Sequence, residues 1–159
     1  MNPASIASPW GPALEIVLVL LALCAGAGLS VQAGVNTAMR GYVGRTEYAA
    51  LVNFAVGLAA LLIWLLVMRK PWPALSSVGR APWWSWTGGL IGVFYVNVVV
   101  LLTQRLGVGM TLALAIAGQM SAALLLDHAG LLGLPIRQVT ARHMLGAALL
   151  VAGVVLIRR

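Results

Sequence analysis

The chain has 159 residues, of which 62% are hydrophobic and only 8% charged, with a formal net charge of +7. A soluble domain carries about 25% charged residues, so this composition excludes an ordinary soluble protein. Nucleic-acid binding would need a basic face with interleaved aromatic residues, whereas the ten basic residues here lie in short loops and at the ends of apolar runs, where they meet lipid headgroups.

Five long apolar runs follow one another along the chain, and each is close to the length of about 20 residues that crosses a bilayer core. Backbone groups in lipid need internal partners, and the runs are continuous rather than alternating, so they predict helices and not barrel strands. The sequence predicts an all-α integral membrane protein with one transmembrane domain over residues 1–159. The expected spans are 14–38, 46–68, 83–103, 108–126 and 141–157.

Short polar or proline-containing segments mark the expected span ends. Pro82 stands where the third span begins, a position that tolerates a missing N–H. Thr46 and Glu47 predict an N-cap followed by an acid in the first turn, and Thr140 is expected to cap the fifth span in the same way. The segment 104–107 is expected to be the turn between the third and fourth spans.

The basic residues divide evenly between the two membrane surfaces that these spans define. Side A carries Arg69, Lys70, Arg80, Arg137 and Arg142, and side B carries Arg40, Arg45, Arg105, Arg158 and Arg159. Lys and Arg near span ends normally fix orientation because they stay on the cytoplasmic side. An unbiased chain with an odd number of spans predicts dual topology and an antiparallel homodimer.

Two further features agree with pairing. Many transporters need two inverted halves for alternating access, and here the second half would come from a second chain. The tryptophans, which normally anchor both surfaces, all map to side A or its interface, so two opposed copies would supply both belts. They are Trp10, Trp64, Trp72, Trp83, Trp84 and Trp86.

Five amide side chains lie inside the predicted spans: Gln32, Asn36, Asn53, Asn97 and Gln119. At about 1.5 Å of rise per residue, Gln32, Asn53 and Asn97 fall roughly 9–11 Å from the side B end of their spans. Gln119 falls about 16 Å from that end on the same spacing. Amides inside spans commonly only hold helices together. Several at similar depth favour a polar cavity lining instead, and we predict that these five residues contact a solute.

The acidic residues and histidines lie near span ends. A proton-coupled transporter usually has a carboxylate within the membrane, and Glu15 is the best candidate, although an interfacial, hydrated role is the simpler interpretation. Asp127 with His128 is interpreted as a helix-end pair or a gate. Gly88 with Gly92 and Gly118 with Ala122 permit close helix approach, within one protomer or between two.

No zinc-ligand spacing, nucleophile elbow or phosphate-binding loop is recognisable, so the sequence predicts no enzyme, no metal and no cofactor. The single cysteine, Cys24, allows no intrachain disulfide framework.

Several stretches resemble the short five-helix family of the bacterial drug/metabolite transporter superfamily (EamA-like). These are Gly28–Asn36, Asn53–Gly57, Pro82–Gly92 and the run from Gly118 and Gln119 through Asp127, His128 and Gly130 to Gly133. The resemblance covers about residues 14–157 and departs at Asn53 and Ala129. It implies half-size units that pair into a ten-helix bundle, an inner-membrane location and secondary transport.

The sequence thus predicts a multi-pass inner-membrane transporter of a small metabolite or drug-like solute, with membrane lipid, a second copy and the solute as partners. A small dual-topology channel and a non-transporting membrane partner protein stay open as alternatives. Pairing with an oppositely oriented paralogue is disfavoured by the even charge count, because paired paralogues usually have opposed biases.

Overall fold

The computed structural model describes residues 11–157, and within this range the regular structure is entirely helical. Trp10, Arg158 and Arg159, which entered the arguments about surface belts and charge, lie outside the described residues. The long helices are α1 (Pro12–Val43), α2 (Thr46–Val67), α4 (Gly88–Ala129) and α5 (Ala141–Ile157), joined by the short helices α3 (Leu75–Val78), η2 (Trp83–Thr87) and η3 (Leu131–Gly133).

Three helical stretches are long and apolar enough to cross a membrane: Pro12–Val43, Thr46–Val67 and Trp83–Ala129, with Ala141–Ile157 a shorter apolar helix. The expected turn at 104–107 is present as a break inside α4. Gly107 has φ 78° and ψ 163°, which ends the helical path locally. Glycine tolerates this conformation because it has no Cβ.

Two predicted helix starts have different outcomes. Thr140 directly precedes α5, as expected, and its carbonyl accepts the N–H of Met144 at 3.1 Å. The N-cap predicted at Thr46 is wrong, because Arg45 occupies the cap position and Thr46 is already helical. The Thr46 hydroxyl accepts a hydrogen bond from Arg40 Nε at 3.0 Å instead, so a contact between helices replaces the local cap. Glu47 lies in the first turn as predicted.

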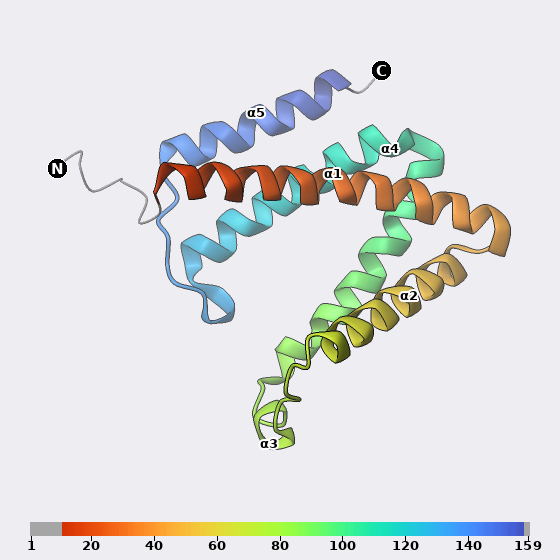
Figure 1. Cartoon of the computed structure of the whole chain (residues 1–159). Coiled ribbons are helices and arrows are strands. Elements are labelled where there is room, and N and C mark those ends of the chain that lie inside the picture. The colour runs from red at the N-terminus through yellow and green to blue at the C-terminus, as the bar shows by residue number, and fades with distance from the viewer. Residues whose placement is uncertain (1–10, 158–159) are drawn as a thin grey trace.

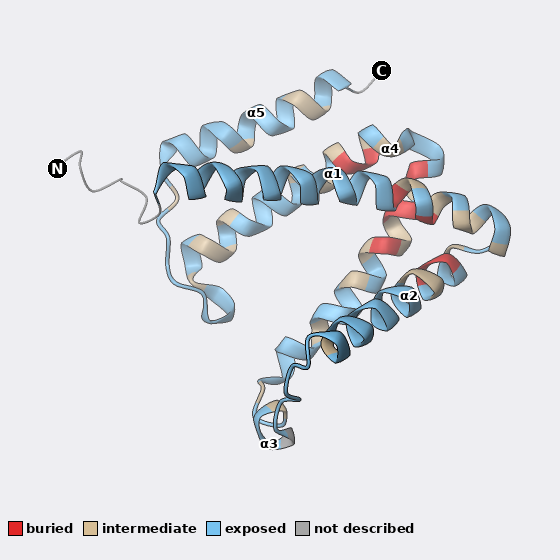
Figure 2. Cartoon of the chain, in the orientation of Figure 1, coloured by how far each residue is buried: buried red, intermediate tan, exposed pale blue. Residues whose placement is uncertain are grey.

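The helices meet near one end and diverge from it. Figure 1 shows α2 running beside the first part of α4, while α1 and α5 extend away with the second part of α4. Buried residues gather where α1, α2 and α4 approach one another (Figure 2): Ala33, Asn36, Ala49, Ala50, Val96, Val99, Val100, Thr103, Thr111 and Leu112. α5 contacts only α4 among the described elements and has no buried residue.

Gly92 lies at the contact between α2 and α4. A Cβ added at Gly92 would lie 3.4 Å from the Phe54 ring, an ordinary van der Waals distance. Gly92 of the small-residue pair therefore packs against another helix of the same chain. A Cβ added at Gly118 would meet no atom within 4 Å, so that position is open in the single chain.

Candidate solute-binding site

Two of the predicted amides meet across the α1–α2 pair. Gln32 Nε2 donates to Asn53 Oδ1 at 3.4 Å, a long hydrogen bond between residues 21 apart in sequence. Gln32 is exposed and Asn53 half-buried. The pair retains unused hydrogen-bonding capacity, because each amide has two donor hydrogens and two acceptor lone pairs.

Asn36 lies one helical turn beyond Gln32 on the same face of α1. It is only 6% exposed, and it is the only amide among the described residues to be buried. Asn36 and Gln32 line a cavity of about 10 Å³ against Tyr95, Val96 and Val99 of α4. A space of this size is at the lower limit for a single water molecule, so the site is nearly closed here.

Gln119 occupies a larger pocket, of about 300 Å³, between the two parts of α4. Tyr95 and Val99 line this pocket as well as the small cavity that holds Asn36. These two side chains therefore lie between the two spaces, and we call them the Tyr95 wall.

Asn97 does not join the other amides. Its Nδ2 donates to the Val93 carbonyl of its own helix at 2.9 Å, and it lines neither of the spaces just described. The structure thus brings Gln32, Asn36 and Asn53 together, sets Gln119 across the wall, and leaves Asn97 with a local partner.

Tyr95, Thr103 and Thr111 were missed by the sequence reasoning. Tyr95 packs against both buried hydrophobic clusters. Thr111 donates to the Gly107 carbonyl at 2.8 Å, whereas buried Thr103 Oγ1 has no hydrogen-bond partner among the described residues. A pattern in the sequence could have indicated that Tyr95 and Thr103 face the core. Gly92, Tyr95, Val99 and Thr103 follow one another at intervals of three or four residues, which is typical of one helix face.

Arg40 ties three helices together beside the amides. Its guanidinium donates to Thr46 at the start of α2 and to the Gln104 side-chain oxygen of α4. Within residues 11–157 the sole ion pair is Arg45–Glu47 at 3.4 Å, and both its side chains are well exposed. Arg40 thus joins α1 to α2 and α4 through hydrogen bonds and not through a salt bridge.

The three predicted coupling or gate residues lie apart from the amides. Glu15 is exposed in the first turn of α1. Asp127 and His128 lie at the end of α4, where the Asp127 carbonyl accepts the Arg137 N–H at 2.7 Å and His128 Nδ1 accepts the Val139 N–H at 3.5 Å. Both therefore hold the returning segment before α5, and a coupling or gating role stays a prediction.

No group of three His, Cys, Asp or Glu side chains in the described part of the chain could hold a metal ion. The site offers amides, a phenol and hydroxyls. Such groups bind a solute through hydrogen bonds rather than by charge or coordination.

Long apolar helices with amides between them define a multi-pass membrane protein. Residues 17–156 match the family described as "Putative inner membrane exporter, YdcZ", and the chain belongs to this family. It is 30% identical over 138 residues to "Inner membrane protein YdcZ" of Escherichia coli (strain K12), a match covering 86% of this chain and 91% of the relative. No solved structure matches the chain. The predicted family and location are confirmed, and the family is described as one of inner-membrane exporters and not as an enzyme family.

Proposed function

We propose that this protein exports a small polar or weakly charged solute across the inner membrane, as an antiparallel homodimer of five-span protomers. The observation that carries the proposal is the Gln32–Asn53 amide pair beside buried Asn36, with Gln119 across the Tyr95 wall. Membership of an exporter family supports transport. The solute, the pairing and the mechanism are our inference.

The break at Gly107 supports five spans. Trp83–Ala129 contains 47 residues, about 70 Å if straight, which is more than twice the thickness of about 30 Å of a hydrocarbon core. The segments 88–106 and 108–129 correspond to about 28 and 33 Å, and each fits one crossing. α5 has 17 residues, at the lower end of the spanning range of roughly 17–25 residues.

Exposed polar groups support a second copy. Gln32 and Gln119 are exposed in the single chain although both lie within apolar helices. Polar side chains at membrane depth normally face a bundle interior or a water-filled cavity. An inverted copy packed against α1 and the second part of α4 would cover both amides and complete a ten-helix bundle.

A labelling experiment tests the cavity without knowledge of the solute. In a Cys24→Ser background, single cysteines replace Gln32, Gln119 or Asn97, and membranes are treated with N-ethylmaleimide, which needs a hydrated thiol. We expect rapid labelling at positions 32 and 119 and slow labelling at 97. Slow labelling at all three would mean a packed, dry layer and would favour the non-transporting partner protein.

Transport itself is tested in proteoliposomes with a panel of radiolabelled polar metabolites. Replacing Asn36 or Gln119 by leucine should abolish saturable uptake and counterflow while the dimer stays folded, whereas Asn97→Leu, a matched amide deletion, should retain both. Retained transport in both site variants would remove this assignment. Conductance without saturation or counterflow would indicate a channel.

A further inference from the structure

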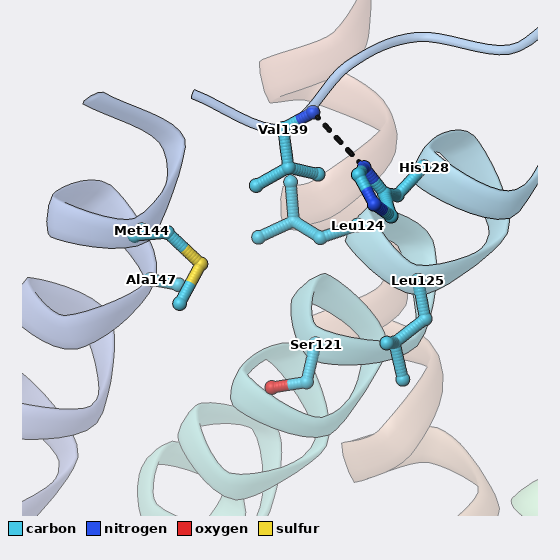
Figure 3. Close-up of a pocket in the computed structure, with 7 residues that line it drawn as sticks. All are labelled: Ser121, Leu124, Leu125, His128, Val139, Met144 and Ala147. Atoms are coloured by element: carbon cyan, nitrogen blue, oxygen red, sulfur yellow. Dashed lines mark hydrogen bonds between the residues drawn. The ribbon is translucent and has the colours of Figure 1, made fainter. Parts of the chain in front are cut away.

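A second candidate site lies at the far end of the α4–α5 pair, away from the amides. A pocket of about 500 Å³ opens between these helices, within the range of roughly 300–1,000 Å³ typical of ligand sites. Figure 3 shows Leu124, Leu125, Met144 and Ala147 around it, with Ser121 and His128 as its polar groups. The pocket is therefore apolar along its length and polar at its margin.

A smaller, polar pocket of about 130 Å³ adjoins it. Asp127, Arg137, Gln138 and His143 line this space, and Leu124 and Val139 line both pockets. The Val139 N–H that donates to His128 (Figure 3) fixes the strip between them. A molecule lying across Leu124 would have an apolar part in one pocket and a polar part in the other.

The polar pocket is lined by one acidic and one basic residue that form no ion pair with each other. Asp127 and Arg137 both line it, yet the one ion pair among residues 11–157 is Arg45–Glu47. The Arg137 backbone is held by its N–H bond to the Asp127 carbonyl at 2.7 Å. The pocket also borders the first turn of α5, where the helix dipole favours an anion. A carboxylate and a guanidinium that are not paired with each other complement a ligand that carries both charges.

We propose that the adjoining pockets bind an amphiphile with a zwitterionic headgroup. Asp127 accepts hydrogen bonds from a primary ammonium, Arg137 with His143 binds a phosphate or carboxylate, and the alkyl chain lies between α4 and α5 against Leu125, Met144 and Ala147. This chemistry fits a bilayer lipid or a free single-chain amphiphile. The site is independent of the amide layer and of the proposed export.

The test measures lipid retention on the purified full-length protein in a nonionic detergent by native mass spectrometry. Equal amounts of phosphatidylethanolamine and phosphatidylglycerol are added, because the second lipid is anionic and has no ammonium. The wild-type protein should retain phosphatidylethanolamine in preference. Asp127→Asn should reduce that preference about tenfold, as expected for one charge-assisted hydrogen bond, whereas Glu47→Gln, which removes a carboxylate elsewhere, should leave it unchanged.

A second variant keeps the proposal testable if Asp127→Asn does not fold. Ala147→Trp fills the apolar pocket and leaves every charged group in place, so it should reduce retention of both lipids. Adding lysophosphatidylethanolamine then distinguishes the sources: displacement of the two-chain lipid indicates a site for free amphiphiles, and retention indicates a bilayer-lipid site. Equal retention of both lipids by wild type, or full retention by Ala147→Trp, would overturn the proposal.

Discussion

At the scale of single residues, the most informative side chain is Arg40. In the sequence its charge bears only on orientation, yet in the structure Arg40 is half-buried and its guanidinium hydrogen-bonds to α2 and α4. Gln104 is 64 residues away, so no local pattern could indicate this contact. Asn97 is the opposite case, because its partner is the carbonyl one turn earlier.

Arg40→Gln should destabilise the protein by about 1.5–3 kcal/mol, the range for hydrogen bonds to charged groups. Arg45→Gln is the matched control, because it removes a side B charge from a solvent-exposed ion pair that contributes little to stability. Unfolding in a mixed-micelle titration measures both. If both variants lost the same free energy of unfolding, Arg40 would contribute through its charge alone and not through its hydrogen bonds to α2 and α4.

At the scale of elements, the end of α4 is set by Gly130. This residue has φ 59°, and its N–H donates to the Leu126 carbonyl to end the helix. A Cβ added there would lie 2.5 Å from Ile136 Cγ1 and 3.3 Å from the Leu134 oxygen. The turn that positions the Asp127–Arg137 pocket therefore requires glycine for both its conformation and its space.

Gly130→Ala should cost more stability than Gly133→Ala. Both positions have positive φ, which costs an L-residue about 1–2 kcal/mol, but a Cβ at Gly133 would meet nothing within 4 Å. Thermal unfolding in one detergent compares the two variants. Adding Ile136→Ala should recover part of the loss in Gly130→Ala, because it removes the clashing atom; failure to recover would place the whole cost in the backbone.

At the scale of the whole molecule, the charge balance predicts two orientations. In two separate Cys24→Ser variants, a single cysteine replaces Ser77 of α3 or is placed at the C-terminus. An impermeant thiol reagent on intact cells should label about half of the protein at each site, because neither surface holds the excess of Lys and Arg that fixes topology. Labelling at one site alone would mean one orientation and a different partner.

A variant with extra positive charge on one side tests whether the charge balance causes the two orientations. Ser76→Lys with Ser77→Lys adds two positive charges to side A, which should then stay cytoplasmic. The C-terminal cysteine should become almost fully labelled in intact cells. Export activity should fall together with the loss of the second orientation if antiparallel pairing is needed for transport, and unchanged activity would contradict that pairing.

The sequence by itself determined the helical class, the membrane setting, the turn at 104–107 and the last helix over 141–157, because apolar run length and turn residues act locally. It also placed five amides in the spans. The tertiary structure alone decided which amides meet and where Tyr95 separates them. It also decided the hydrogen bonds of Arg40 to α2 and α4, and the pocket that Asp127 and Arg137 line. These features depend on which faces of distant helices pack together, and in apolar helices that choice rests on small differences in close packing that leave little periodic signal in the sequence.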